Sequence, residues 1–267
     1  MKIIISHDVD HLSVKEHLLN DLYLPKLFIR DIYHLLFSRI SFGEYLLRLK
    51  EILNNKISYI KELCEYNKEN NIPATFFLAV KKGRSLSYSN KQLNQAITLI
   101  NTYEKTDCLI HGIEIKNIHN LKNEKLEFTR VTGINPSGIR MHYLSKKDNI
   151  QNLHNAKYSF DSSLYGIKNP YKMNGIIEFP IQLMDVFDVP NIKFSDSNFN
   201  VIKNNTINKI KDCEKRGLKY LVVDFHDRYF SEAYLNYFEW YKFLINYLIS
   251  NNYVFSSFKD IDLKNIK

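Results

Sequence analysis

Side chains that can do acid–base or metal chemistry recur in this chain directly after runs of apolar residues. The first run, Ile3-Ile4-Ile5, leads into Asp8 and Asp10, with a histidine on either side of the pair. Such a run predicts a buried strand, and residues two positions apart share one face of an extended chain. Later segments end in the same manner at His111, at Arg140 and His142, at Asp161 and at His226.

Acids, imidazoles and one guanidinium gathered at a common rim would suit metal-dependent hydrolysis. Carboxylates and imidazoles bind zinc and similar divalent ions, and such sites also need a base, an acid and a cation that holds the base in place. A lone Asp-x-Asp is more often a solvated turn. The repetition at several strand ends favours a functional reading, because each unpaired charge taken out of water costs several kcal/mol.

The elements that must position these side chains alternate between strands and helices, which is typical of an α/β fold. Strands are expected at 72–80, 107–112, 176–181 and 218–228, and helices at 91–104, 121–132, 201–216 and 232–250. The carboxyl ends of parallel strands form the edge at which α/β proteins hold ligands. The sequence therefore predicts one α/β barrel domain over residues 1–267, with the chemical groups at its mouth.

A helical insertion is expected at about 12–60, with breaks at Pro25 and Gly43, because this tract exceeds what one crossover helix needs. It could be a lid over the cleft, a helix pair in peripheral contact with a membrane, or an ordinary amphipathic layer on the barrel. It mixes aromatic and basic side chains, among them Tyr23, Phe28, Tyr33, Phe37, Lys26, Arg30, Arg39 and Arg48.

Composition narrows the location and the partners. The net charge of +8 suits a phosphate-bearing substrate or an anionic membrane, but no arginine-rich block indicates nucleic acid. The cysteines at 64, 108 and 213 are too widely spaced to indicate a disulfide framework or a thiolate zinc site. The first strand begins at residue 2, which leaves no room for a signal peptide, and no stretch of about 20 apolar residues is present. We therefore expect a soluble, cytoplasmic protein.

Taken together, these segments resemble the polysaccharide deacetylase family (NodB-like, carbohydrate esterase family 4) over nearly the whole chain apart from the insertion. The motifs of that family have a fixed order, and this chain keeps it. The matching segments are His7-Asp8-Val9-Asp10, Ala74-Thr75-Phe76-Phe77, His111-Gly112, Gly138-Ile139-Arg140-Met141-His142-Tyr143, Phe160-Asp161-Ser162-Ser163-Leu164 and Phe225-His226.

The resemblance implies a distorted (β/α) barrel with a divalent metal, commonly zinc, at its mouth. It implies Asp8 as the catalytic base, Arg140 as the partner of that base and His226 as the general acid. Asp10 and His111 would be metal ligands. The residues expected at the substrate are His142, Tyr143 and Asp161.

One position departs from the family pattern. The second metal histidine of the family normally lies four residues after the first, and that position here is Ile115. His119 is the third ligand that we expect, if the intervening loop folds back. Glu114 and His142 are alternatives.

The expected reaction is N-deacetylation of an acetamido sugar. A family member that acts in the cytoplasm would use a nucleotide- or lipid-linked intermediate of surface polysaccharide biosynthesis. The alternatives are a catalytically impaired, deacetylase-like carbohydrate-binding protein and, as a weaker one, a phosphatase of the Asp-x-Asp type with Asp8 as nucleophile. The phosphatase would need a later acidic pair at a strand end, where this chain has His226.

Overall fold

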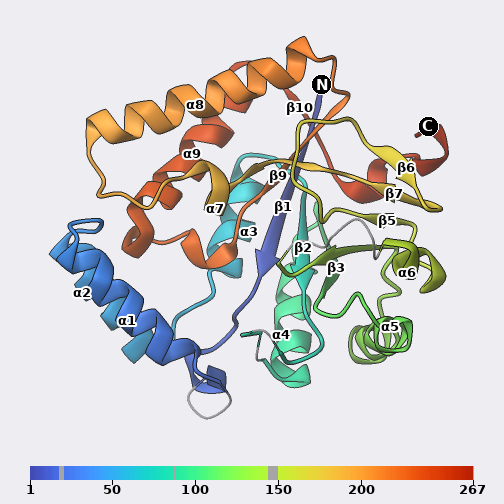
Figure 1. Cartoon of the computed structure of the whole chain (residues 1–267), viewed down its shortest axis with the longest axis horizontal. Helices are drawn as coiled ribbons and strands as arrows, with labels where there is room; N and C mark the ends of the chain where they lie inside the picture. The colour runs from blue at the N-terminus through green and yellow to red at the C-terminus, as the bar shows by residue number, and fades with distance from the viewer. Residues whose placement is uncertain (18–20, 84, 87, 144–149, 267) are drawn as a thin grey trace.

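The centre of the protein is a mostly parallel sheet. The computed structural model describes residues 1–17, 21–83, 85–86, 88–143 and 150–266 (Figure 1). The strand order is β6-β7-β5-β4-β3-β2-β1-β9-β8, and β10 also pairs with β1. The strands are β1 (Lys2–Val9), β2 (Ala74–Leu78), β3 (Thr106–Gly112), β4 (Gly138–Met141), β5 (Phe160–Asp161), β6 (Tyr171–Met173), β7 (Ile176–Glu178), β8 (Ile181–Met184), β9 (Tyr220–Asp224) and β10 (Val254–Ser256).

The sheet curves back toward itself. The segment after β5 meets β8, at the far end of the strand order, where the backbone N–H of Gly166 donates to the carbonyl of Ile181 and that of Ile181 donates to Leu164. The mostly parallel sheet and its covering helices confirm the predicted α/β class, and the curvature is consistent with a distorted barrel.

Both faces of β1 are covered, which explains why this strand is apolar without interruption. Ile3 and Ile5 pack against the helical layer, whereas Ile4 belongs to a second apolar cluster on the inner face. Because side chains alternate along a strand, Asp8 lies on the same inner face as Ile4. The inner cluster also contains Phe77, Leu109, Phe160, Phe179, Ile181, Val222 and Phe258.

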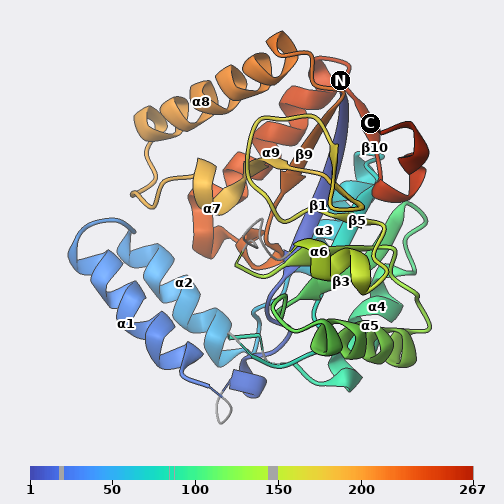
Figure 2. The same ribbon diagram turned by 45° about the vertical axis from the view of Figure 1, so that its right-hand side comes forward.

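Helices cover the outer face of the curved sheet, with α8 and α9 at one side of the molecule and α4 and α5 at the other (Figures 1 and 2). Helix α5 ends at Gly133 as expected, where a φ of 73° stops the helix without the strain that a side chain would bring. The helices after the insertion are α3 (Ile60–Glu69), α4 (Asn90–Ile100), α5 (Ile118–Thr132), α6 (Ile150–Asn155), α7 (Asp185–Asp188), α8 (Asp196–Lys215) and α9 (Leu235–Ser250).

The insertion is a helical hairpin at the edge of the molecule, made of α1 (Tyr23–Leu36) and α2 (Phe42–Leu53) (Figures 1 and 2). A short 3-10 helix, η1 (Val14–His17), precedes it, and residues 18–20 of the predicted insertion lie outside the described residues. The two predicted breaks in this helical tract are present, but they lie a few residues before Pro25 and Gly43. Pro25 lies in the first turn of α1, where a missing backbone N–H costs nothing, and Gly43 is the second residue of α2. The chain turns between these helices, and a capping box at Ser41 starts α2.

A buried arginine, Arg48, fastens the hairpin to the rest of the fold. Nη1 of Arg48 lies 2.9 Å from Oδ1 of Asp31, so the pair joins α2 to α1. Nε of Arg48 donates to the carbonyl of Ala233 at 2.8 Å, and the guanidinium lies 4.3 Å from the centroid of the Tyr234 ring. Both contacts belong to η4 (Glu232–Tyr234), directly before α9. The insertion is therefore held against the C-terminal part of the fold.

The hairpin leaves many large apolar side chains in solvent. Leu36 is 75% and Leu53 85% exposed, in a protein whose other large apolar side chains are mostly buried. Others on or beside the hairpin are Leu22, Phe28, Ile29, Tyr33, Phe37, Phe42 and Leu46. Among the described residues, no helix has the length and apolar character needed to cross a membrane.

Strand lengths in the second half differ from those expected. The expected strand at 176–181 is two strands, β7 and β8, divided at Phe179 and Pro180. The expected strand at 218–228 ends at Asp224, and His226 follows it in an extended conformation before the 3-10 helix η3 (Asp227–Tyr229). The proline and the 3-10 helix explain the shortening, because neither continues a parallel ladder.

Candidate functional site

The two aspartates after the first apolar run converge on one imidazole. Asp8 is in β1 and Asp10 follows it, while His111 is the penultimate residue of β3. Nε2 of His111 lies 3.8 Å from Oδ2 of Asp8 and 3.4 Å from Oδ1 of Asp10. Asp8 and Asp10 therefore lie close together, as expected of two residues on one face of the strand end.

Three ligand atoms form a triangle that fits a divalent metal. Oδ1 of Asp10 lies 3.3 Å from Nδ1 of His142, and the two imidazoles approach to 3.1 Å between Nε2 of His111 and Nδ1 of His142. Ligands about 2.0–2.1 Å from a tetrahedral zinc ion stand roughly 3.3 Å from one another, which is the spacing found here. Oδ1 of Asp10 is also buried without a hydrogen-bond partner among the described residues, as an atom kept for a cation would be.

The expected third ligand, His119, does not join this group. It is exposed in the first turn of α5, where its backbone N–H donates to the Asn117 side chain that caps the helix. Glu114, one alternative, accepts a hydrogen bond from the backbone of Lys116 and is also outside the group. The stretch between β3 and α5 thus carries His119 to the surface. His142, the other alternative, follows β4 beside β3, and this is the residue that the structure brings to Asp10 and His111.

Arg140 is the buried centre of a second cluster. Its Nη1 lies 3.0 Å from Oδ1 of Asp8 and 2.7 Å from Oδ1 of Asp224, the last residue of β9. Its Nε and Nη2 donate to the carbonyl and the hydroxyl of Ser162 at 2.8 and 3.0 Å. The guanidinium also lies 4.2 Å from the centroid of the Phe77 ring. Arg140 is therefore fixed by contacts to four strands or strand ends.

The pKa values of Asp8 and Asp224 are shifted in opposite directions in this cluster. Burial alone would raise the pKa of Asp8, but His111, Arg140 and His226 together hold it below its usual value. Burial raises the pKa of Asp224 well above its usual value, in spite of the opposing effect of Arg140. Asp8 is therefore the ionised member of the pair, as a general base must be.

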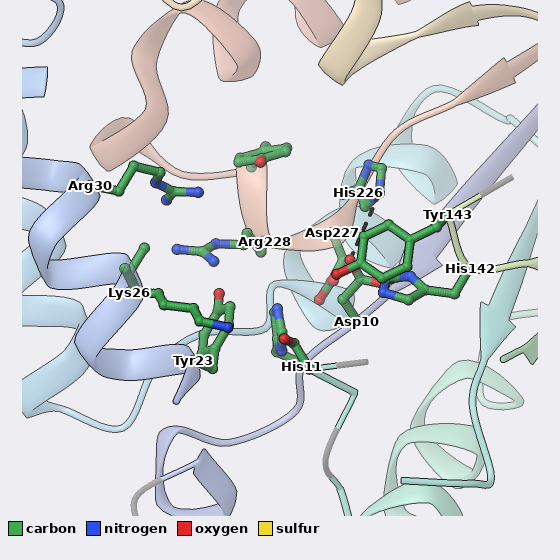
Figure 3. Close-up of a pocket in the computed structure, with 13 residues that line it drawn as sticks. Asp10, His11, Tyr23, Lys26, Arg30, His142, Tyr143, His226, Asp227 and Arg228 are labelled. Carbon is green, nitrogen blue, oxygen red and sulfur yellow. Dashed lines mark ion pairs between the residues drawn. The ribbon is translucent and has the colours of Figure 1, made fainter. Parts of the chain in front are cut away.

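Asp10, His111 and His142 are called the metal group below. His226 faces this group from the opposite side and is held by Asp185. Nδ1 of His226 lies 2.9 Å from Oδ1 of Asp185, and its backbone N–H donates to Oδ2 at 2.6 Å. Burial lowers the pKa of His226, but Asp185 and the other nearby carboxylates outweigh burial and raise it well above its usual value. Nε2 of His226 lies 3.9 Å from Oδ2 of Asp10 (Figure 3). The second ring nitrogen thus points to the side where a substrate would bind.

Asp227 follows His226 directly in the sequence but is not its partner. Asp227 accepts hydrogen bonds from the hydroxyl of Ser58 at 2.6 Å and from the backbone of Tyr59 at 3.0 Å. Asp185, the partner that is present, follows β8 as the first residue of α7.

Asp161 was expected to contact substrate, and its position does not allow this. It has no exposed surface, accepts a hydrogen bond from Ser163 and lies opposite Glu178 in the parallel pairing of β5 with β7. Burial raises the pKa of Asp161 to about 6, and it also raises that of Glu178 well above its usual value. The two acids therefore form a buried pair behind Arg140 and are not part of the substrate surface.

A pocket of about 270 Å³ opens in front of these groups (Figure 3). One side is lined by Asp10, His142, Tyr143 and His226. Tyr143 is 66% exposed at the rim, where its ring lies 4.0 Å from that of His142 between centroids. The opposite side is lined by residues of α1 and η3, so the insertion supplies one wall of the pocket.

Solved structures of known proteins share this architecture. A protein assigned to the polysaccharide deacetylases from Mycobacterium smegmatis superposes with a TM-score of 0.64 at 12% identity, over 99% of this chain and 89% of its own. One assigned to the same group from Pseudomonas aeruginosa gives 0.56 at 15% identity, over 76% and 71%. This chain has the polysaccharide deacetylase fold.

The resemblance drawn from the motifs is thereby confirmed at the level of the fold. No family model matches the sequence, and no curated protein matches it either. The deacetylase fold is also shared with a carbohydrate esterase family 4 pseudoenzyme from Bacillus anthracis, with a TM-score of 0.50 at 10% identity over 97% of this chain and 64% of its own. The fold is therefore common to enzymes and a pseudoenzyme.

Two acids of the site were missed by the sequence reasoning. Asp224 ends β9 two residues before His226, and Asp185 follows directly on β8. Both obey the rule that had singled out Asp8, an acid at the carboxyl end of an apolar strand. The sequence therefore carries the same local signal for Asp185 and Asp224.

Proposed function

We propose that the chain is a metal-dependent N-deacetylase of an acetamido sugar. The observation that carries the proposal is the triangle formed by Asp10, His111 and His142, placed between a buried base and a protonated imidazole. Its supporting contacts are those of Arg140 with Asp8 and of Asp185 with His226. The deacetylase fold agrees with a hydrolase of the carbohydrate esterase family 4 kind and with a carbohydrate substrate.

The residues of this chain divide the reaction into proton removal and proton delivery. A divalent ion held by Asp10, His111 and His142, which we propose to be zinc, would polarise the amide carbonyl and lower the pKa of a neighbouring water toward about 7. Asp8 takes the proton from the attacking water, and Arg140 keeps Asp8 ionised and aimed. The backbone amide near Tyr143 stabilises the developing oxyanion.

The second half of the reaction depends on His226. It donates a proton to the leaving amine, and Asp185 keeps its imidazole charged until that moment. The products are acetate and the free amino sugar. The proton that Asp8 has taken passes to solvent and His226 takes one back from solvent, so both groups return to their starting state after each turnover.

Acetate release from a panel of N-acetyl sugars, with and without a nucleotide or lipid group, tests the proposal. Asp8→Asn should abolish turnover and leave the fold intact. Asp107→Asn, a matched change of a largely buried aspartate at the other end of β3, should leave turnover unchanged. Acetate release by Asp8→Asn at the rate of the unaltered protein would overturn the assignment of the base.

A catalytically impaired sugar-binding protein is the second candidate, since the Bacillus anthracis pseudoenzyme has the same fold. The same panel separates the two functions. Sugar binding by metal-loaded protein without acetate release from any substrate would favour this candidate. Phosphate release in place of acetate would favour a phosphatase, although Asp8 is only 2% exposed and is engaged by Arg140.

We propose that the substrate is a nucleotide- or lipid-linked intermediate of surface polysaccharide biosynthesis and that the reaction takes place in the cytoplasm. The positive net charge supports a substrate that bears phosphate.

We also propose peripheral contact of the hairpin α1–α2 with an anionic membrane. The exposed apolar side chains of the hairpin support it, because apolar groups beside lysine and arginine bind at lipid interfaces. Sedimentation with anionic liposomes tests the contact. Ile29→Gln with Leu36→Gln should reduce binding, whereas Val201→Gln, a change of an exposed apolar residue on α8, should not. Equal sedimentation of both variants would refute it.

A further inference from the structure

Three cations line the wall of the pocket that faces the metal group. Lys26 and Arg30 extend from α1, and Arg228 comes from η3, two residues after His226 (Figure 3). The carboxylates on the lining are Asp10, which belongs to the metal group, and Asp227, whose Oδ2 is taken up by Ser58 and Tyr59. The far wall therefore has a positive charge of its own.

These cations are poorly neutralised by the described part of the chain. No carboxylate of the described residues lies within 4.0 Å of Lys26 or Arg228 in an ion pair. Arg30 lies 3.5 Å from Oδ1 of Asp31, but the same oxygen receives the stronger contact from Arg48 at 2.9 Å. A positive wall without matching acids favours the binding of an anion.

Arg228 is the buried member of this wall, whereas Lys26 and Arg30 are exposed on α1. It is only 8% exposed, and its Nε is buried without a hydrogen-bond partner among the described residues. The guanidinium donates to the hydroxyl of Tyr234 and lies between aromatic rings, 5.6 Å from the centroid of Tyr23 and 5.0 Å from that of Tyr234. A buried arginine donor without a partner is unfavourable, and an oxygen of a bound anion would satisfy it.

We propose that Lys26, Arg30 and Arg228 form a phosphate subsite that holds the phosphorylated end of the substrate while its acetamido group lies at the metal. This inference rests on the proposed function and adds to it the residues that recognise the phosphate of the substrate. Two guanidinium groups and one ammonium can contact several oxygens of one phosphate, whereas a carboxylate offers them only two oxygens. Two of the three cations come from the hairpin, so the insertion is a specificity element of the pocket.

Binding of sugars that have no amide tests the subsite independently of deacetylation. Calorimetry would compare glucose, glucose 1-phosphate, glucuronate, uridine diphosphate glucose and a short-chain prenyl diphosphate glucose. Glucose 1-phosphate should bind at least about tenfold more tightly than glucose, the gain expected of one or two charge-assisted contacts, and the gain should shrink with salt. Uridine diphosphate glucose and prenyl diphosphate glucose should bind at least as tightly as glucose 1-phosphate. The one that binds more tightly identifies whether the natural carrier is a nucleotide or a lipid.

Exposed cations of the hairpin provide matched controls. Lys26→Gln and Arg30→Gln should each weaken glucose 1-phosphate binding several-fold, and both changes lie on an exposed face that tolerates substitution. Lys50→Gln and Arg39→Gln alter the same hairpin away from this pocket and should have no effect. Arg228→Gln should abolish the phosphate gain, with its fold checked by thermal unfolding.

Three results would overturn the subsite. They are equal affinity for glucose and glucose 1-phosphate, equal losses in the test and control variants, and binding of glucuronate as tight as that of the phosphate. A failure of the proposed function is a different result, because it is an absence of acetate release while the phosphate preference persists.

Discussion

Removing Arg140 should destabilise the protein strongly, because two buried carboxylates depend on it. In Arg140→Met, Asp8 and Asp224 lose contacts of 3.0 and 2.7 Å in a region with almost no exposed surface. Breaking a buried ion pair from one side typically costs about 3–5 kcal/mol of unfolding free energy, since the remaining charge stays buried. We expect a loss in that range at pH 7, measured by urea unfolding in the presence of a chelator.

A second substitution shows whether the loss has this cause. Asp224→Asn removes one of the stranded acids, so it should restore roughly 1–3 kcal/mol when added to Arg140→Met, the coupling usual for residues in one network. Arg216→Met removes an exposed arginine that pairs with Asp212 on α8, and it should change stability little.

The loss should also depend on pH in a definite direction. Without Arg140, burial raises the pKa of Asp8 and Asp224 in the folded state, so their charge destabilises the fold more as the pH rises above the unfolded values near 4. The difference between Arg140→Met and the unaltered protein should therefore shrink from pH 7 toward pH 4. A loss below about 1 kcal/mol, or a loss that neither acid pH nor Asp224→Asn reduces, would refute the reasoning.

Three further predictions concern a buried acid, the general acid and the third ligand. Burial raises the pKa of Glu124 to about 7, so this residue destabilises the fold increasingly as the pH rises from the unfolded pKa near 4.5 to above 7. Glu124→Gln should therefore raise the free energy of unfolding by up to about 3 kcal/mol more at pH 8 than at pH 4, measured by urea unfolding. An equal change at both pH values would contradict this. Asp185→Asn should lower the pKa of His226 and move the alkaline limb of the kcat profile to lower pH, which an unshifted profile would disprove. His142→Ala should remove the bound metal in elemental analysis while His119→Ala retains it, and the reverse result would restore His119 as the ligand.

The strands and their acidic ends could be predicted from the sequence because their signals are local. A short apolar run favours a strand that is covered on both faces, and residues two apart in a strand share a face. Asp8, Asp10, His111, Arg140 and His226 follow from that rule. So does the α/β class, since parallel strands need helical crossovers.

Which side chains meet could not be read from local patterns. Asp8 and Arg140 are 132 positions apart, and Asp185 and His226 are 41 apart. The meeting of such residues depends on strand order and on how far each loop carries its side chains. The choice of His142 over His119 shows this, because the loop after β3 leads outward whereas β4 lies beside β3.

The sequence by itself determined the alternation of strands and helices and the chemical inventory at the strand ends, since both depend on short-range periodicity. Only the tertiary structure decided that Asp185 raises the pKa of His226, that Asp161 is buried with Glu178, and that the hairpin brings its cations to the pocket. Those outcomes depend on contacts between distant segments, whose free energies come from burial and charge pairing in the assembled fold.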